Sequence, residues 1–421
     1  MKIFEGKRFF IYGDGISARA AYRAIAKNGG KAKIYTDRCG LFDTPPDRPY
    51  DGAVVSPGIK PTHNVYKFCA ERNIRAFGEA EIGFSLAKCR SVGVTGTNGK
   101  TTTTRLIADM IGGTACGNIG YPVTAAADKE RTALVCELSS FQLYNSVVTP
   151  DVAVIVNVAE DHLDWHGSAE EYYRCKCNIA ANMAGGFLVI GDDVPIGALG
   201  SLRTKAEIIR CSVDGAANCG AYVRDGYFWF DGKRVSPVDY LRLQGRHNLK
   251  NALCAVAAAK CMGADNDRIL MALSSATLSP HRLENAGGAL GKRWIDDSKS
   301  TNVSSCLAAI EATTGSLCLI VGGRDKGLDY KTLFCALDES RIESVVAMGE
   351  SAQLIRDGAA KSKCGIRVTV VDGLSDAVKA AAKSAADTVL LSPACASFDE
   401  FTDYKARGEK FRAEVKALES K

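Results

Sequence analysis

The stretch 92-VGVTGTNGKTTTTRLIADM-110 joins a short apolar run to a glycine turn and then to a helix-like segment. Residues 92–95 are typical of a buried strand, residues 96–99 form the turn, and Lys100 opens the helix. In a strand–turn–helix of this kind, backbone N–H groups of the turn and of the helix N-terminus converge on one anion. The stretch therefore predicts a phosphate site to which Lys100 adds a mobile positive charge.

A magnesium ion is expected beside this phosphate site. Thr101 follows the lysine and is the predicted hydroxyl ligand of Mg²⁺. Charge that builds up during phosphoryl transfer requires a second element to hold the metal, and Glu137, at the end of "ALVCE", is the predicted carboxylate. Val94 stands where the general motif G-x-x-x-x-G-K-[ST] has glycine, and the alternative is a turn that binds nothing. The predicted nucleotide-binding residues of the turn are Gly96, Thr97, Asn98, Gly99, Lys100, Thr101 and Thr102.

Length and composition describe an ordinary globular protein of two or three domains. Of the 421 residues, 46% are hydrophobic and 24% are charged, and no apolar run reaches the roughly 18 residues of a membrane helix. The net charge of +5 is not gathered in blocks of Lys and Arg, so nucleic acid is not expected as a partner. The N-terminus shows no signal-peptide pattern, so a cytoplasmic location is expected. The 16 cysteines include no C-x-x-C pair, which favours free thiols over disulfides or zinc.

Alternating strand-like and helix-like signals predict an α/β protein of three domains. In residues 1–80, "RFFIYGDG", "SARAAYRAIAKNG", "KAKIYTD" and "GAVVSPG" form a Rossmann-like βαβ pattern. Near-continuous Val, Ile and Leu runs in residues 81–278 predict a central P-loop ATPase-like domain with a mainly parallel sheet. Residues 279–421 repeat the alternation through "RWIDDSKS", "LCLIVGG", "SVVAMGE", "VTVVDG" and "DTVLLSPACAS", which predicts a second Rossmann-like domain.

The first turn of the chain has the dinucleotide-binding pattern G-x-G-x-x-A at residues 13–18. Asp37 ends the next strand about 20 residues further on, where a dinucleotide fold places the acid that binds a ribose. The pattern alone suggests NAD. The same glycines also suit other nucleotide-like ligands or close helix–strand packing, so several interpretations remain open at this point.

A dense group of polar residues follows the next apolar run. The segment "NVAEDHLDWHG" places Asp161, His162, Asp164 and His166 within six positions, which is uncommon for a purely structural loop. Zinc is one interpretation, with nearby Cys175 or Cys177 as further ligands. Magnesium is favoured, because it serves the phosphate site that the glycine turn already predicts.

Nine motifs occur in a fixed order along the chain. They are "GTNGKTT", "GNIG", "ELSSFQL", "NVAEDHLD", "GRHNLKNALCA", "SPHRLE", "WIDDSKSTN", "GGRDKG" and "LLSPACASFDEF". With them the chain resembles the Mur ligase family of peptidoglycan biosynthesis, and within it the members that add D-glutamate. The phosphate loop of that family lacks the first glycine of the general motif, which accounts for Val94. The resemblance implies an ATP-dependent amide ligation, in which the γ-phosphoryl group passes to the carboxylate of UDP-N-acetylmuramoyl-L-alanine and the amine of D-glutamate attacks the acyl phosphate.

The resemblance also implies catalytic and metal-binding roles. Lys100 would stabilise the transferring phosphoryl group, and Thr101 with Glu137 would hold a first Mg²⁺. His162 and Lys176 match a second magnesium site and complete the catalytic set, with Lys176 carbamylated as in relatives. A neutral amine that adds CO₂ becomes an anion able to bind the metal. The remaining ATP contacts implied by the family are Asn248, Asn251, Arg282 and Asp297.

Two substrates are implied, each with its own set of residues. The first domain would bind the UDP part, so the turn at residues 13–18 is better interpreted as a diphosphate cradle than as an NAD site. The residues matched to the UDP-muramoyl substrate are Gly15, Asp37, Arg38, Asn118, Ser139 and Gln142. The residues matched to D-glutamate are Lys299, Thr301, Lys326, Ser397 and Tyr404, the last replacing a phenylalanine of well-known relatives. Two lysines and two hydroxyls suit a dicarboxylate.

Three alternatives compete with this assignment. A sister ligase that adds diaminopimelate typically has the motif "DNPR", which this chain lacks. A folylpolyglutamate synthase shares the phosphate loop but normally has no separate UDP-binding domain. A noncatalytic nucleotide-binding regulator would be expected to lose Lys100, Glu137, His162 or Lys176. We therefore expect a cytoplasmic monomer that acts on small molecules and has no membrane or nucleic-acid partner.

Overall fold

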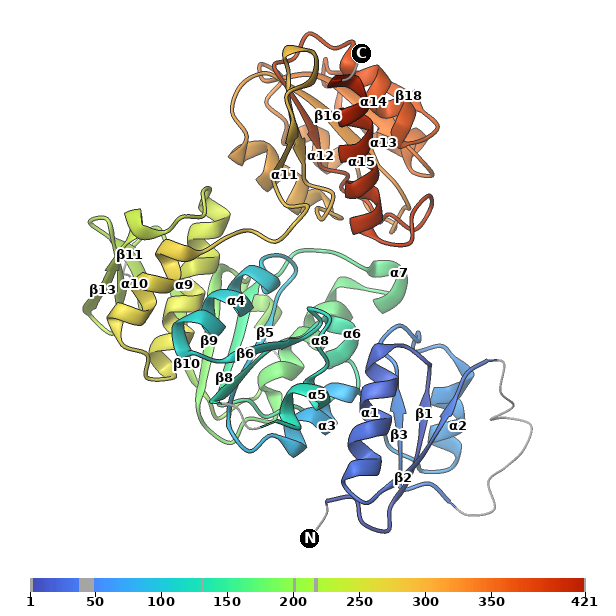
Figure 1. Cartoon of the computed structure of the whole chain (residues 1–421), viewed down its shortest axis with the longest axis vertical. Helices are drawn as coiled ribbons and strands as arrows, with labels where there is room; N and C mark the ends of the chain where they lie inside the picture. The colour runs from blue at the N-terminus through green and yellow to red at the C-terminus, as the bar shows by residue number, and fades with distance from the viewer. Residues whose placement is uncertain (1–2, 38–48, 130–131, 200–201, 216–218, 420–421) are drawn as a thin grey trace. The chain divides into compact units, whose positions relative to one another are not determined.

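The computed structural model of the chain describes residues 3–37, 49–129, 132–199, 202–215 and 219–419 (Figure 1). They form two compact units. Unit 1 comprises Met1–Glu160, Trp165–Leu243 and His247–Ala276, and unit 2 comprises Asp161–Asp164, Gln244–Arg246 and Thr277–Lys421. Unit 1 contains two sheets and unit 2 contains one, and most strand pairs are parallel. The predicted α/β fold is confirmed. None of the helices described is both long and apolar enough to cross a membrane.

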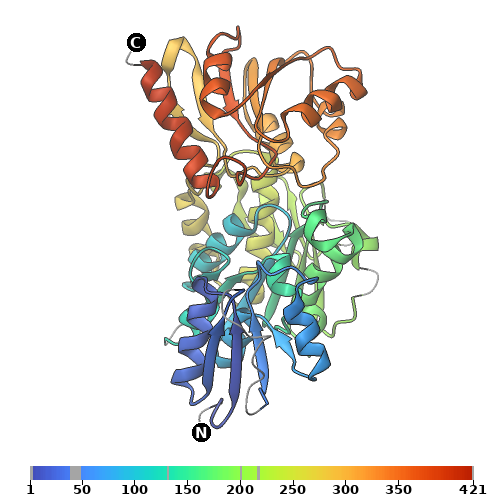
Figure 2. The same ribbon diagram turned by 90° about the vertical axis from the view of Figure 1, so that its right-hand side faces the viewer.

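The N-terminal sheet is parallel and has helices on both faces. Its strands are β1 (Arg8–Tyr12), β2 (Lys31–Tyr35), β3 (Gly52–Val55) and β4 (Ala76–Phe77), in the order β2-β1-β3-β4. Its helices are α1 (Ile16–Lys27), α2 (Asn64–Glu71) and α3 (Glu79–Leu86). Because successive strand side chains point to opposite faces, Phe9 and Ile11 pack in the core with α1, whereas Phe10 and Tyr12 pack with α2. Figure 2 shows the strands in blue with a helix on either side.

The central sheet has nine strands. They are β5 (Arg90–Thr95), β6 (Thr114–Gly117), β7 (Ala133–Glu137), β8 (Val152–Asn157), β9 (Phe187–Asp193), β10 (Glu207–Ser212), β11 (Ala221–Arg224), β12 (Tyr227–Phe230) and β13 (Lys233–Pro237), in the order β13-β12-β11-β10-β9-β8-β5-β7-β6. In the spatial order from β6 through β7, β5, β8, β9 and β10 to β11, each strand pairs with its neighbour in parallel. Strands β11, β12 and β13 form an antiparallel ribbon at the end of the sheet. Strand β13 is an edge strand that begins with the exposed side chains Lys233 and Arg234.

The helices that accompany the central sheet are α4 (Lys100–Ile111), α5 (Val123–Ala127), α6 (Ser140–Leu143), α7 (Leu163–His166), α8 (Ala169–Ala181), α9 (Arg246–Cys261) and α10 (Asn266–Ser275). Two of them, α4 and α9, carry part of the predicted nucleotide site. Because β5, β7 and β8 are parallel neighbours, the loops that follow them leave the same edge of the sheet. Residues 96–99, 138–139 and 158–160 therefore lie at one edge.

The sheet of unit 2 contains all five apolar runs that the sequence predicted as strands of the third segment. Its strands are β14 (Glu284–Gly287), β15 (Arg293–Asp296), β16 (Leu317–Gly322), β17 (Ile342–Met348), β18 (Arg367–Val371) and β19 (Thr388–Leu391), in the order β14-β15-β19-β16-β17-β18. Its helices are α11 (Val303–Ala312), α12 (Lys331–Cys335), α13 (Ala352–Ser362), α14 (Leu374–Ala382) and α15 (Tyr404–Glu419). Leu319 and Val321 of β16 face the core with α12 and α13, and Cys318 and Ile320 face the core with α14 and α15.

Candidate active site

The loop at residues 96–99 connects β5 to α4, as the sequence predicts. The end of β8 holds it: the N–H of Asn98 donates to Oδ1 of Asn157 at 2.9 Å, and the N–H of Thr97 donates to the Asn157 carbonyl at 3.1 Å. Gly99 has a φ of 76°, and a Cβ at this position would collide with Oδ1 of Asn251. The positive φ favours glycine here, and a larger residue would displace the Asn251 side chain. Helix α9 thus brings Asn251, a predicted ATP contact, against the loop.

Two lysines converge on the carbonyl oxygen of Gly96. Nζ of Lys100 donates to it at 2.8 Å and also to the carbonyl of Thr97 at 2.8 Å. Nζ of Lys176, which is buried on α8, donates to the same Gly96 oxygen at 2.8 Å and lies 4.3 Å from the ring centre of Tyr172. The hydroxyl of Tyr172 in turn donates to Oγ1 of Thr97 at 3.1 Å. The structure therefore joins two of the three predicted catalytic residues through one loop carbonyl.

The two predicted ligands of the first magnesium ion are in contact. Oγ1 of Thr101 donates to Oε2 of Glu137 at 2.8 Å, and Nδ2 of Asn118 donates to Oε1 of Glu137 at 3.0 Å. Glu137 is buried at the end of β7, so both of its oxygens are fixed beside the phosphate loop. A hydroxyl and a carboxylate are hard oxygen ligands of the kind that Mg²⁺ prefers. The donor set therefore fits a magnesium ion.

Asn248 and Asn251 lie buried on α9 and are joined by a hydrogen bond of 3.3 Å from Nδ2 of Asn251 to Oδ1 of Asn248. The other two predicted ATP contacts, Arg282 and Asp297, belong to unit 2. The carboxylate of Asp297 accepts from the hydroxyl of Ser392 at 2.8 Å. Burial raises its pKa to about 6, against the opposing charge of Arg282. Joint binding of one nucleotide by the two asparagines, Arg282 and Asp297 stays a prediction.

His162 also belongs to unit 2, in the loop that contains residues 161–164. It has a positive φ of 54°, and its Nε2 lies 3.7 Å from Oδ2 of Asp161. Lys176 belongs to unit 1. The predicted pairing of His162 with Lys176 in a second metal site therefore stays a prediction.

The predicted D-glutamate residues all lie in unit 2. Nζ of Lys299 donates to Oγ of Ser279 at 3.3 Å and lies 5.7 Å from the ring centre of Tyr404. Nζ of Lys326 donates to the carbonyl of Thr301 at 3.0 Å. Ser397 is buried in the loop after β19. Lysine charges and hydroxyl groups are thus available in this unit, as a dicarboxylate requires.

Asp161, which the sequence placed in a candidate metal-binding group with His162, pairs with Lys326, a contact that the sequence did not predict. Its Oδ1 accepts from Nζ of Lys326 at 3.1 Å, and its Oδ2 accepts from Nδ2 of Asn302 at 2.9 Å. Burial opposes ionisation of Asp161, but the charges of Lys326 and His162 and the hydrogen bonds outweigh it and hold its pKa at about 2. Lys326 therefore faces a fixed negative charge.

Arg407 is a buried residue that the sequence did not assign. It is buried on α15, and its guanidinium donates to the carbonyls of Ser298 at 2.9 Å, Cys395 at 3.1 Å and Ala396 at 3.3 Å. These carbonyls precede Lys299 and Ser397 in the chain, so Arg407 holds the backbone of two loops with predicted D-glutamate contacts. No sequence signal distinguishes it, because "YKARGEKFRAEV" has the charged pattern of an exposed helix.

The residues matched to the UDP-muramoyl substrate are only partly described. Arg38 lies outside the described residues. Asp37 accepts at Oδ1 from the hydroxyl of Tyr12 at 2.5 Å and pairs with Nε2 of His63 at 3.0 Å. The hydrogen bonds from Tyr12 and His63 lower the pKa of Asp37. Gly15 caps the N-terminus of α1, where nothing would obstruct a Cβ.

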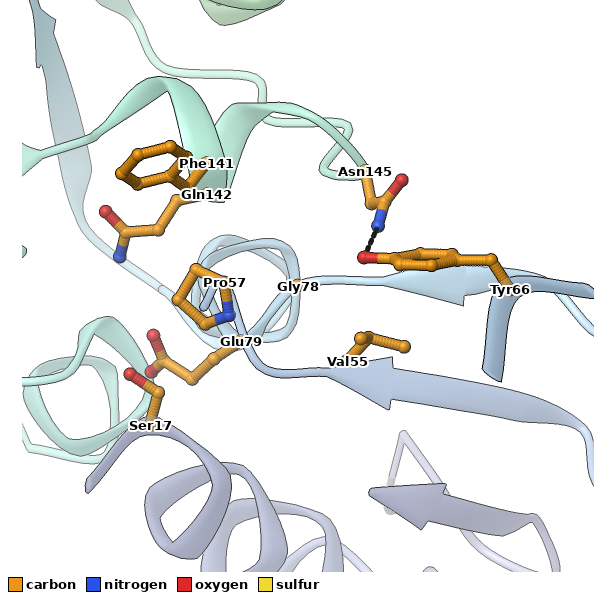
Figure 3. Close-up of a pocket in the computed structure, with 9 residues that line it drawn as sticks. All are labelled: Ser17, Val55, Pro57, Tyr66, Gly78, Glu79, Phe141, Gln142 and Asn145. Carbon is orange, nitrogen blue, oxygen red and sulfur yellow. Dashed lines mark hydrogen bonds between the residues drawn. The ribbon is translucent and has the colours of Figure 1, made fainter. Parts of the chain in front are cut away.

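Ser139 and Gln142 form a capping box at the start of α6. Oγ of Ser139 accepts from the N–H of Gln142 at 3.2 Å, and Oε1 of Gln142 accepts from the N–H of Ser139 at 3.0 Å. Gln142 also lines a pocket within unit 1. The residues around this pocket are Ser17, Val55, Pro57, Tyr66, Gly78, Glu79, Phe141, Gln142 and Asn145 (Figure 3). It brings together the N-terminus of α1, the end of β3 and helix α6.

The fold and the loop geometry define a class of protein, namely α/β proteins with a P-loop-type turn between a strand and a helix. Residues 94–259 match the family model of the Mur ligase middle domain. This chain is 37% identical to the UDP-N-acetylmuramoylalanine–D-glutamate ligase of Latilactobacillus sakei, and the match covers 85% of this chain and 81% of that protein. Its namesake from Halalkalibacterium halodurans is 35% identical over 99% of this chain and 98% of that protein. The chain belongs to the Mur ligase family.

Solved structures share this fold at low sequence identity. A pseudomurein peptide ligase type C from Methanothermus fervidus has a TM-score of 0.62 and 18% identity, and the match covers 98% of this chain and all of that one. The UDP-N-acetylmuramate–alanine ligase MurC from Thermotoga maritima has a TM-score of 0.61 and 18% identity, covering 99% and 100%. At these identities the likeness concerns the fold alone.

Proposed function

We propose that this protein is an ATP-dependent ligase that joins D-glutamate to UDP-N-acetylmuramoyl-L-alanine. The observation that carries the proposal is the 35% identity with a D-glutamate ligase over nearly the whole length of both chains. The phosphate loop, with Lys100 at its mouth and Thr101 against Glu137, supports the ATP-dependent part. A carboxylate resists nucleophiles until one oxygen becomes part of a good leaving group, so activation as an acyl phosphate precedes attack by the amine.

The residues around the loop divide the work of phosphoryl transfer. The N–H groups in the first turn of α4 and the Lys100 side chain would orient the outer phosphates, and Thr101 with Glu137 would hold Mg²⁺ against them. When bound, the metal supplies positive charge to oxygens that become more negative during transfer. Asn248 and Asn251 would bind the nucleoside part together with Arg282 and Asp297.

A second magnesium site at His162 and a carbamylated Lys176 is part of the proposal. The shared Gly96 carbonyl supports it, because two ammonium groups on one acceptor repel each other. Conversion of the Lys176 amine to a carbamate removes that repulsion and adds an anionic oxygen ligand. Lys176 is buried, so its amine is protected from bulk water.

The substrates would bind at separate places. Gly15, Asp37 and Arg38 would hold the UDP part, with Asn118, Ser139 and Gln142 toward the muramoyl group. Lys299, Thr301, Lys326, Ser397 and Tyr404 would hold D-glutamate by charge pairing and hydrogen bonds. We also propose that residues 1–80, 81–278 and 279–421 are the domains that carry the UDP substrate, ATP and the amino acid. A cytoplasmic monomer without nucleic-acid or membrane partners completes the proposal.

An assay of phosphate release tests the proposed ligase function. Purified protein, MgATP and UDP-N-acetylmuramoyl-L-alanine are combined with D-glutamate, L-glutamate, L-lysine or diaminopimelate in parallel. We expect release with D-glutamate only, and formation of the amide product in equal amount. Release with another amino acid would assign the chain to a sister ligase, and no release with any of them would refute a ligase function. Replacement of the muramoyl substrate by a folate tests the folylpolyglutamate alternative.

A further inference from the structure

A buried tyrosine, Tyr330, connects the loops that follow two neighbouring strands of unit 2. It stands directly before α12 and is only 3% exposed. Its hydroxyl donates to Oδ1 of Asp325, in the loop after β16, at 2.8 Å. The same hydroxyl lies 3.2 Å from Sγ of Cys395, in the loop after β19. The side chain of Tyr330 therefore links two loops that are far apart in the sequence.

A third loop joins this chain of hydrogen bonds through Ser351, which is buried directly before α13 in the loop after β17. Its Oγ lies 3.2 Å from Sγ of Cys395. Strands β19, β16 and β17 are parallel neighbours, so the three loops leave the same edge of the sheet. Open α/β sheets place their ligands at this edge. The hydrogen bonds thus lie where a substrate would be held.

The positions of the protons follow from the carboxylate at one end of the chain. A carboxylate only accepts, so the hydroxyl proton of Tyr330 points to Asp325. The thiol of Cys395 then donates to the Tyr330 oxygen, and the hydroxyl of Ser351 donates to the thiol sulfur. Burial raises the pKa of the Tyr330 phenol and of the Cys395 thiol, so both groups keep their protons. The hydrogen bonds therefore run in one direction, from Ser351 to Asp325.

A backbone bridge brings the loops after β16 and β19 together but ends before Lys326. Arg324 and Ala396 form this antiparallel bridge, in which the N–H of Arg324 donates to the Ala396 carbonyl at 2.9 Å. Asp325 and Cys395 flank the bridge on the same side, because the two segments run in opposite directions. The hydroxyl of Tyr330 joins their side chains. It therefore extends the connection to the residue directly before Lys326.

We propose that Tyr330 is a positioning residue that holds Lys326 and Ser397 at the separation that D-glutamate requires. The inference rests on the proposed function, in which these two residues contact D-glutamate. Lys326 follows Asp325 directly, and Ser397 comes two residues after Cys395. A dicarboxylate held at two points is sensitive to their separation, because charge-assisted hydrogen bonds require short distances of about 2.7–2.9 Å. Tyr330 acts through its neighbours and not by contact with the substrate.

A purely structural role is the competing explanation, since the ring of Tyr330 belongs to the core of unit 2. It packs there with Leu333 and Phe334, and its backbone lies close to Gly358. Tyr330→Phe separates the two roles, because phenylalanine keeps the ring in the core and removes only the hydroxyl. The side chains of Asp325 and Cys395 then lose the group that joins them.

Tyr330→Phe is made in the full-length protein and assayed with D-glutamate and with D-aspartate, which is shorter by one methylene group. We expect KM for D-glutamate to rise by about tenfold, while kcat and KM for ATP change by less than about twofold. The ratio of kcat/KM for D-glutamate to that for D-aspartate should fall, because the site no longer holds one fixed separation. Initial rates of phosphate release provide all of these values.

Two replacements of Cys395 provide a second test. Cys395→Ser keeps a donor for Tyr330 and an acceptor for Ser351, whereas Cys395→Ala removes both. If the thiol only fills space, Cys395→Ala is the milder change, because a buried thiol behaves as a small hydrophobic group. The proposal predicts the reverse, with a smaller rise in KM for D-glutamate in Cys395→Ser. The matched control is Cys318→Ala, at a buried thiol that faces α14 and α15, and its KM should equal that of the wild type.

The outcomes separate the inference from its premise. A wild type that forms no amide with D-glutamate refutes the proposed function, and the inference with it. With an active wild type, an unchanged KM for D-glutamate in Tyr330→Phe overturns the inference alone, as does an equal rise in KM for ATP. A higher KM in Cys395→Ser than in Cys395→Ala also overturns it, and this comparison holds even if Tyr330→Phe does not fold.

Discussion

Lys100 of α4 and Lys176 of α8 donate hydrogen bonds to the same acceptor, the carbonyl oxygen of Gly96, each at 2.8 Å. One lysine would suffice to neutralise a phosphate oxygen. The second is buried. A chemical change of Lys176 from cation to anion would turn this crowded arrangement into a metal site.

The first prediction concerns the carbamate of Lys176. Turnover should increase when bicarbonate is added to protein freed of CO₂, because the proposed ligand of Mg²⁺ is the anionic carbamate form of Lys176. Lys176→Arg keeps the positive charge but cannot be carbamylated, so it should lose activity by about a hundredfold or more and show no response to bicarbonate. Steady-state phosphate release measures both. A wild-type enzyme that is fully active and unmodified in an intact-mass spectrum would contradict the prediction.

The second prediction concerns the contact between Thr101 and Glu137. Glu137→Gln keeps the size of the side chain but removes its charge, so the Mg²⁺ concentration for half-maximal activity should rise by about tenfold or more. Asn118→Ala removes the hydrogen bond to Oε1 together with a proposed substrate contact but leaves the carboxylate charge, so it should raise the Mg²⁺ requirement less than Glu137→Gln does. A magnesium titration of the initial rate provides the measurement. Equal titration curves for wild type and Glu137→Gln would exclude Glu137 as a ligand.

The third prediction concerns Asp297, whose pKa burial raises to about 6 from 3.8. A raised pKa means that the folded state binds the proton more tightly than the unfolded state. The stability that this tighter proton binding contributes is full below pH 3.8 and is lost as the pH rises through about 6. At pH 8 the loss of unfolding free energy amounts to about 3 kcal/mol. Asp297→Asn should therefore be more stable than the wild type at pH 8 but not at pH 4, while losing activity.

Urea unfolding at the two pH values, followed in the same buffer series, measures this difference. A residue kept ionised at a cost to stability is typical of a functional site. If Asp297→Asn is equally or less stable at pH 8, ionisation of this buried carboxylate carries no cost, and the raised pKa is wrong.

The fourth prediction concerns Arg407. Lysine cannot reproduce the fork of guanidinium N–H groups that bind the carbonyls of Ser298, Cys395 and Ala396. Arg407→Lys should lower the free energy of unfolding by about 2–4 kcal/mol and raise KM for D-glutamate more than KM for ATP. The control is Arg412→Lys on the same helix, where the pair with Glu284 is partly exposed and the effect should stay below about 1 kcal/mol. Equal KM values for D-glutamate in wild type and Arg407→Lys would limit Arg407 to a structural role.

The part of the site that is contiguous in sequence could be predicted from the sequence. A phosphate loop, its lysine and the threonine after it occupy residues 96–101, and local geometry alone assembles them. The position of Glu137 could be predicted too, because the carboxyl ends of neighbouring parallel strands meet at one sheet edge. The strands of the third segment were equally clear, since a sheet covered on both faces requires long apolar runs.

Contacts between residues that are distant in the sequence could not be predicted in this way. Neither Arg407 nor the pairing of Asp161 with Lys326 leaves a local pattern, because each depends on which loops the sheet of unit 2 brings together. The ribbon β11–β13 was missed for another reason. Its strands have four or five residues, and one of its faces carries arginines stacked on Tyr227 and Trp229, so its sequence lacks a simple apolar period.

That ribbon also has a consequence for the behaviour of the protein in concentrated solution. A nine-stranded sheet with a bare edge would be a template for pairing with other chains. Here the last strand, β13, exposes Lys233 and Arg234 and ends at Pro237, which cannot donate a backbone hydrogen bond. Like charges on two such edges repel each other, so this edge of the sheet is protected against self-association.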